Sequence, residues 1–213
     1  MGNFFNMDGG VMGTLSKITD VIILSLIFLV FSIPIITMGA SFTALYYSAV
    51  KSVRRGRSYI FKSFWKSFKE NFGSATVLWL IILLAGAILG LNLWFSGHVL
   101  TGKISFVLFC IYAMMAVTIS LVIIYIFPLL SRFNMSKKKL ISTAFFMAIK
   151  HLPYSVLMVF IFIASLVASY IVPLLIFVMP AAGALLLSMP MERILKKYMP
   201  ESVDASKDEW YLE

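Results

Sequence analysis

The feature that most limits the possible folds of this chain is a series of long apolar runs separated by short basic segments. A helix needs roughly 20 apolar residues to cross the hydrocarbon core of a bilayer, and several of the runs reach that length. The chain is 61% hydrophobic and 13% charged, whereas soluble domains are about 45–50% apolar and about 25% charged. Both departures favour an integral membrane protein.

We predict an all-α, polytopic transmembrane helix bundle over residues 1–200 and a polar tail at 201–213. About five spans are expected, at residues 18–37, 75–95, 104–129, 154–170 and 172–190. The last two are separated near Ser169–Pro173, because the run from Tyr154 to Ser188 is too long for one span. One alternative stays open. If residues 18–53 form a re-entrant hairpin, four full spans remain and the N-terminus lies inside instead of outside.

The basic residues indicate which side of the membrane each loop occupies. Between Lys51 and Lys69 every charged residue is basic, and the segment from Ser131 to Lys150 also lacks an acid. Cytoplasmic loops carry such an excess of Lys and Arg. We therefore place both segments, and the C-terminus, in the cytoplasm. This topology explains the net charge of +9 better than nucleic-acid binding does, so no nucleic-acid partner is expected.

The stretch from Tyr59 to Phe72, within a basic amphipathic region at 42–72, predicts a helix with an aromatic and a polar face. At helical spacing the aromatic stripe is Phe61, Phe64, Trp65, Phe68 and Phe72, and the other face carries Lys62, Ser63, Lys66, Ser67, Lys69, Glu70 and Asn71. We expect the aromatic residues at an interface, with Lys62, Lys66 and Lys69 facing anionic headgroups or an acidic partner. An anchor in the headgroup layer and a docking surface for another protein both fit this pattern.

Little in the sequence points to catalysis. Ionisable residues are nearly absent from the predicted spans, where Asp20 reads as an interfacial acid and Asn92 as a group able to bond across helices. His98 and His151 are predicted on opposite sides of the membrane, and Cys110 is the single cysteine. We therefore predict no catalytic residue, no cofactor, no metal site and no enzymatic activity.

Residues 34–72 carry a resemblance to a known family. Pro34, Thr37, Gly39, the Ala44–Leu45–Tyr46 group, the basic loop, and Phe64, Phe68 and the Lys69–Phe72 run are similar to the YesL family of bacterial integral membrane proteins, a domain of unknown function, as is the ending RILKKY at 193–198. The resemblance implies a Gram-positive-type bacterial plasma membrane. It also implies a gene context of polysaccharide use, beside carbohydrate ABC importers and glycoside hydrolases.

Two functions are consistent with these observations. The first is a non-enzymatic accessory membrane subunit associated with a carbohydrate (oligosaccharide) ABC import system, with the permease subunits as partners. The second is a small stand-alone transporter or channel, formed by an oligomer, in which Asn92 and the kinked segments at Pro34 and Pro180 would line a path.

Overall fold

The structure, a computed structural model, describes residues 10–54, 56, 59–99, 102–133 and 135–198, with side chains from residue 15 onward. The predicted tail at 201–213 lies outside these residues, as do Arg55 and Arg57 of the basic loop. Every described element is helical. The main helices are α1 (Gly10–Ser32), α2 (Met38–Ser48), α3 (Ile60–His98), α4 (Lys103–Arg132), α5 (Lys137–Lys150), α6 (Leu152–Ile171) and α7 (Met179–Leu195). Four shorter segments join them: η1 (Ile35–Thr37), η2 (Ala49–Arg54), η3 (Pro173–Phe177) and η4 (Lys196–Tyr198).

Four helices are long and apolar enough to cross a membrane, which agrees with the predicted all-α bundle. They comprise residues 15–32, 60–98, 103–132 and 152–171. The run predicted as a fifth span, 172–190, is divided into η3 and the 17-residue α7. Pro173 begins η3 and Pro180 lies in the first turn of α7, where the missing backbone N–H leaves no helical hydrogen bond unmade.

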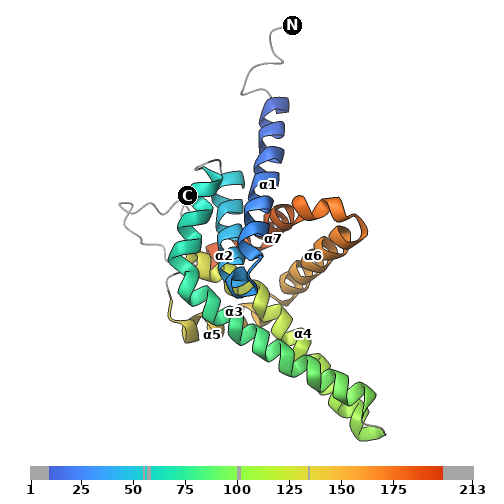
Figure 1. The fold of residues 1–213 in the computed structure, drawn as a ribbon. Helices are drawn as coiled ribbons and strands as arrows, with labels where there is room; N and C mark the ends of the chain where they lie inside the picture. Colours follow the sequence, from blue (N-terminus) through green and yellow to red (C-terminus); the bar gives the residue numbers. More distant parts are fainter. Residues whose placement is uncertain (1–9, 55, 57–58, 100–101, 134, 199–213) are drawn as a thin grey trace.

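The segment from α1 to η2 folds back on itself as a helical hairpin (Figure 1). Its tip is fastened by Thr37 Oγ1, which donates to the carbonyl of Phe31 at 2.6 Å, and by Ser41 Oγ, which donates to the same carbonyl at 2.9 Å. Lys17 in the first half of α1 and Arg54 at the end of η2 line one pocket. The two ends of the hairpin therefore lie side by side, which is the arrangement that the alternative for residues 18–53 assumes.

The central element of the core is α2, which packs against α1, α3, α4 and α7. Its buried face is rich in small residues, among them Gly39, Ala40 and Ala44. Small residues let helix backbones approach closely. The closest approach is at Gly39, where an added Cβ would lie 2.6 Å from both the carbonyl oxygen of Ala75 and Cβ of Trp79. Gly39 therefore fixes how α2 crosses α3.

We expect Gly39→Ala to lower the free energy of unfolding by about 1–3 kcal/mol, because the new methyl group forces α2 away from the α3 backbone. The matched control is Gly90→Ala on α3, where an added Cβ meets nothing within 4 Å. That variant should be neutral or stabilising by up to about 1 kcal/mol, since alanine favours helices over glycine. Unfolding in mixed detergent–SDS micelles measures both, and equal effects would contradict the close approach at Gly39.

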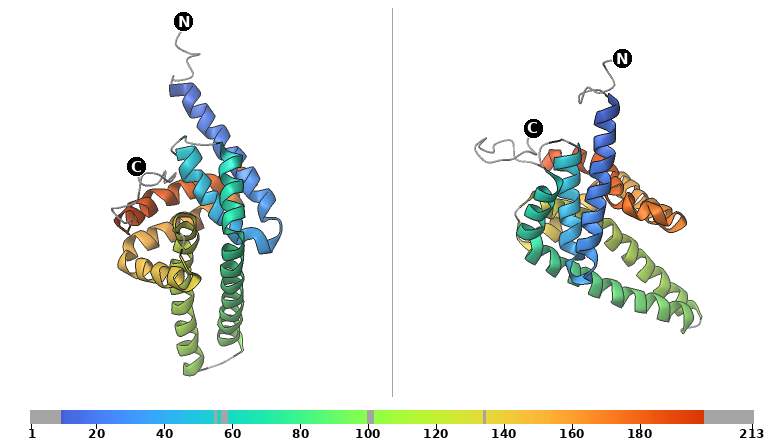
Figure 2. Two further views of the ribbon diagram at one scale, coloured as in Figure 1. Left: turned by 90° about the vertical axis from the view of Figure 1, so that its left-hand side faces the viewer. Right: turned by 45° about the horizontal axis from the view of Figure 1, so that its top comes forward.

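The predicted aromatic helix and the predicted second span form one continuous helix, α3, of 39 residues. Its distal half pairs with α4 in a long hairpin that projects away from the other helices in all three views (Figures 1 and 2). Large apolar side chains cover this hairpin, and Leu84, Leu91 and Phe106 are each about two-thirds exposed. Such surface is stable in contact with lipid or with another apolar protein surface.

Candidate functional sites

A buried polar cluster lies where α2, α4 and α7 meet. Tyr46 Oη donates a hydrogen bond to Glu192 Oε1 at 2.7 Å. The guanidinium of Arg132, through Nη2, forms an ion pair with Oε2 of the same carboxylate. The side chains of Arg132 and Glu192 are only 1% and 6% exposed, and Tyr46 is also buried. Each of three helices that are distant in sequence thus contributes one polar group.

The electrostatics of this cluster favour a neutral tyrosine and a charged ion pair. Burial, and then the negative charge of Glu192, raise the pKa of Tyr46 well above its ordinary value. The phenol therefore keeps its proton and acts as a donor. A carboxylate that accepts from both Tyr46 and Arg132 is compensated, because buried charges are tolerated when they are paired and hydrogen-bonded. The cluster joins three helices and does not present a free base or nucleophile.

Arg54 extends this polar layer toward the surface. Its Nη1 atom lies 3.3 Å from the carbonyl oxygen and 3.2 Å from Oγ of Ser188, which is one turn before Glu192 on α7. Arg54 is exposed, whereas Ser188 is buried. The end of η2 is therefore attached to α7, and a guanidinium remains accessible from outside.

The structure divides the predicted aromatic stripe into two sets. Phe64 and Phe68 are buried against Phe31 of α1, with ring centroids 5.5 and 5.1 Å from it. Phe61, Trp65 and Phe72 are 57%, 45% and 40% exposed.

The polar face also differs from the prediction. Ser63 and Ser67 are buried on the same side as Phe64. The reason is a neighbour from outside the helix: Ser52 Oγ of η2 donates to Ser63 Oγ at 2.9 Å. The prediction that both serines share the polar face with the lysines was therefore wrong, because they are buried while Lys62, Lys66 and Lys69 are exposed.

The exposed residues form an aromatic–cationic face, which we define as Phe61, Trp65, Phe72, Lys62, Lys66 and Lys69. The rings of Phe61 and Trp65 are stacked, with centroids 6.5 Å apart, and Trp65 stacks in turn on the buried Phe68 at 6.0 Å. This backing holds the exposed rings in place. The face combines aromatic area with positive charge on a rigid helix, as expected for an interface.

The other sequence candidates do not assemble into a site. Asn92 Nδ2 donates to the carbonyl of Ile88 on its own helix at 2.8 Å and so makes no bond across helices there. His98 lies at the end of α3, and His151 lies 3.1 Å from the hydroxyl of Tyr198. Burial, with Lys197 and Lys150 nearby, lowers the pKa of His151. Among the residues that the structure describes, no cluster of His, Cys, Asp and Glu could hold a metal.

The buried cluster is the feature that the sequence interpretation missed, since Arg132 was assigned to a cytoplasmic basic segment and Glu192 lies just beyond the last predicted span. One signal could have indicated it. Glu192 is the single acidic residue between Glu70 and Glu201, and it follows a run of apolar residues. A lone carboxylate in a strongly basic chain is a natural partner for a buried cation.

The comparison with known families identifies one match. The family described as a protein of unknown function, DUF624, matches residues 21–93. These residues extend from the middle of α1 through α2 and most of α3, so they include most of the helical hairpin and the whole aromatic–cationic face. Neither a curated protein nor a solved structure matches the chain.

Proposed function

We propose that this protein is a member of the YesL family and a non-enzymatic accessory subunit of a carbohydrate ABC importer in a bacterial plasma membrane. The carbohydrate context rests on the resemblance at residues 34–72, and the DUF624 match covers the same stretch. The single observation that carries the docking role is the aromatic–cationic face. The permease subunits of the importer are the proposed partners.

The physical argument for docking is that aromatic rings are exposed on the first part of α3, which is already held in place by its packing. Interface energy is concentrated in a few aromatic and arginine residues, which gain most when they are preorganised. Trp65 meets this condition because its ring packs on Phe68 and on Phe31, with centroids 6.0 and 5.7 Å away. Lys62, Lys66 and Lys69 lie beside it, and so the complementary surface carries acidic groups.

The proposed orientation places the aromatic–cationic face in the cytoplasm. Cationic residues gather at one end of the bundle. This end is formed by the start of α1, the end of η2, the start of α3 and the ends of α4 and α7. Lys103 lies at the opposite tip of the α3–α4 hairpin. The positive-inside rule then supports a cytoplasmic position for the basic end. The same rule makes anionic headgroups its neighbours.

Photo-crosslinking in cells at native expression tests the proposal. A benzoylphenylalanine at position 65 should crosslink to permease subunits, identified by mass spectrometry. The same group at Phe106, which is 69% exposed at the far end of the hairpin, is the control. Crosslinks to lipid alone from position 65, or equal capture of permease from both positions, would remove the basis for an accessory role.

Charge reversal supplies a second measurement on the same face. We expect Lys62→Glu/Lys66→Glu/Lys69→Glu to reduce permease recovery in mild detergent by at least about tenfold, because like charges across an interface repel. The control is Lys137→Glu/Lys138→Glu/Lys139→Glu, which makes the same change at three exposed positions of α5. A general effect of lost positive charge would reduce recovery equally in both variants and would contradict specific docking.

The alternative, a stand-alone transporter or channel, is tested separately by flux into liposomes that contain this protein alone. A path through the protein would need polar groups directed between helices. The amide of Asn92, proposed to line such a path, is instead bonded to its own helix. We therefore expect no flux above that of empty liposomes.

A further inference from the structure

The helix α5 has an exposed apolar surface in addition to the one that it buries. It packs against α4 and α6. The residues that it buries are Leu140, Ala144, Met147 and Ala148. On another side of the helix, Ile141, Phe145 and Ile149 are between 39% and 52% exposed. Their four-residue spacing places them on one stripe, which we call the outer stripe of α5.

Both ends of α5 are joined to helices that are long and apolar enough to cross a membrane, α4 before it and α6 after it. The hydroxyls of Tyr125 on α4 and Ser155 on α6 share a hydrogen bond of 2.8 Å. Ser155 Oγ also lies 2.9 Å from the carbonyl oxygen of Ala148 on α5. The helix α5 therefore lies where one candidate span ends and the next begins, beside the base of the α3–α4 hairpin and away from its tip (Figure 1).

The outer stripe continues onto the candidate span that follows. Leu152 and Val156, in the first two turns of α6, are exposed as the stripe is. In a helix that crosses a bilayer, apolar side chains of this kind contact lipid. The same lipid is thus adjacent to the outer stripe.

The charges of α5 are all positive. Lys137, Lys138 and Lys139 form its first turn and Lys150 its last, all four are exposed, and the segment from Ser131 to Lys150 has no acid. The positive pole of a helix dipole lies at its N-terminus, so three lysines there are favourable only when anions are close.

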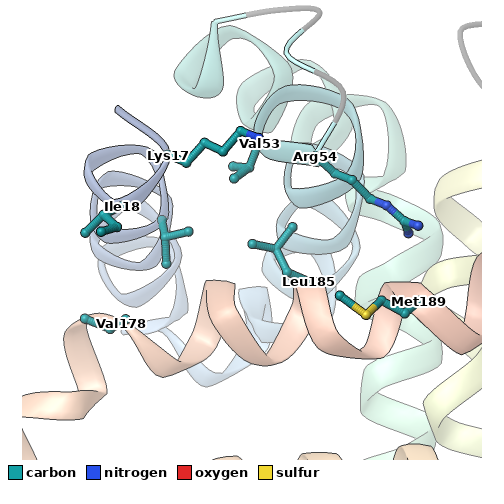
Figure 3. Close-up of a pocket in the computed structure, with 8 residues that line it drawn as sticks. Lys17, Ile18, Val53, Arg54, Val178, Leu185 and Met189 are labelled. Atoms are coloured by element: carbon teal, nitrogen blue, oxygen red, sulfur yellow. The ribbon is translucent and has the colours of Figure 1, made fainter. Parts of the chain in front are cut away.

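The groove between α1, η2 and α7 lacks this convergence of charge. Lys17 and Arg54 line it among apolar side chains. Figure 3 shows the guanidinium of Arg54 directed away from Lys17, and this guanidinium is bonded to Ser188. The lysines of α5, in contrast, are adjacent on one exposed turn.

We propose that α5 lies in the surface of a bilayer that contains anionic lipids. The outer stripe enters the boundary between headgroups and acyl chains, and the lysines lie at the level of the phosphates. Helices with an apolar stripe and a lysine-rich polar side bind membranes in this way, through buried apolar area and attraction to anionic headgroups. In this position α5 holds the end of α4 and the start of α6 at one depth. The inference is independent of the proposed importer role.

Fluorescence quenching tests the position of the outer stripe, with the full chain in vesicles of phosphatidylglycerol and phosphatidylcholine. An environment-sensitive label is attached to the native Cys110, which is exposed on α4. In a Cys110→Ala background it is attached at Phe145→Cys or, as the control on another side of α5, at Lys139→Cys. Spin-labelled acyl chains should quench position 145 about as strongly as Cys110. Acrylamide in the water should quench it several-fold less than position 139, and Ile149→Cys should behave as position 145 does.

The headgroup is tested with spin-labelled phosphatidylglycerol and phosphatidylcholine, compared at equal amounts as quenchers of position 145. We expect phosphatidylglycerol to quench more strongly. Lys138→Gln should reduce that preference roughly fivefold, because one lysine near an anionic surface contributes about that factor. Lys103→Gln, which removes an exposed lysine at the far tip of the hairpin, should leave the preference unchanged.

Three results would overturn the proposal. Quenching of position 145 by acrylamide as strong as that of position 139 would place the outer stripe in water. Protection from both acrylamide and spin-labelled lipid would show that protein covers the stripe, either residues 201–213 or a partner. Equal quenching by the two lipids would contradict an anionic surface.

Discussion

Glu192→Gln is expected to lower the free energy of unfolding by about 3–5 kcal/mol, which is the cost of leaving a buried charge without its counterion. Arg132 is 1% exposed at its side chain and cannot turn to water without moving α4. Titration with SDS in mixed micelles, followed by circular dichroism, measures the loss. The control is Glu70→Gln, the same substitution at an exposed position of α3, which should change stability by less than about 0.5 kcal/mol.

Two further variants separate the charge from the rest of the cluster. Tyr46→Phe removes a donor but leaves the ion pair, so a loss of about 1–3 kcal/mol is expected. Arg132→Met/Glu192→Leu removes both charges and should recover most of the stability lost in Glu192→Gln, because buried ion pairs are often replaceable by apolar residues. A double variant as unstable as Glu192→Gln would show that the unpaired charge is not the cause.

Phe64→Ala is expected to cost about 3–5 kcal/mol, since it empties a fully buried site against Phe31 of α1. Phe61→Ala, one turn earlier on the same helix, removes an identical ring that is 57% exposed. Its cost should stay below about 1 kcal/mol. Unfolding in mixed micelles measures both variants. The pair is matched in residue type and element, and the two positions differ in burial.

The same pair separates stability from docking. Phe61→Ala should fold normally, and less permease should be recovered with it in mild detergent. Phe64→Ala should instead show mainly a lower free energy of unfolding. If the two variants lose stability equally, then the division of the aromatic stripe into buried and exposed sets is wrong.

The sequence predicted the membrane-spanning character because this property depends on the length and apolarity of continuous stretches of the chain. The runs at 75–95, 104–129 and 154–170 all lie within helices of the structure. The structure of residues 172–190 was harder to predict, because apolarity alone does not show that the run is divided into η3 and α7. The sequence also did not show that the aromatic helix ending at Phe72 continues without a break into the span beginning at Ala75. Gly73 there has nothing near its missing side chain and does not end α3.

The interior of the candidate sites depends on neighbours that periodicity does not reveal. Helical spacing placed Phe64 and Trp65 on one stripe, but Phe31 of α1 and Ser52 of η2 decide which edge of that stripe is buried. The polar cluster is more remote still, because Tyr46, Arg132 and Glu192 come from three separate helices. In the sequence, charges at helix ends look the same whether they meet water or each other.

Because α3 is unbroken, it connects the aromatic–cationic face to the far tip of the α3–α4 hairpin as one helix. A helix rises about 1.5 Å per residue, so its 39 residues reach roughly 58 Å from Ile60 to His98. The α1–α2 tip contacts α3 near its middle, where Gly39 lies against Ala75 and Trp79 and the indole N–H of Trp79 donates to the carbonyl of Ile35. Trp65 and the far end of α3 therefore belong to one continuous helix, and the contact with the α1–α2 tip lies between them.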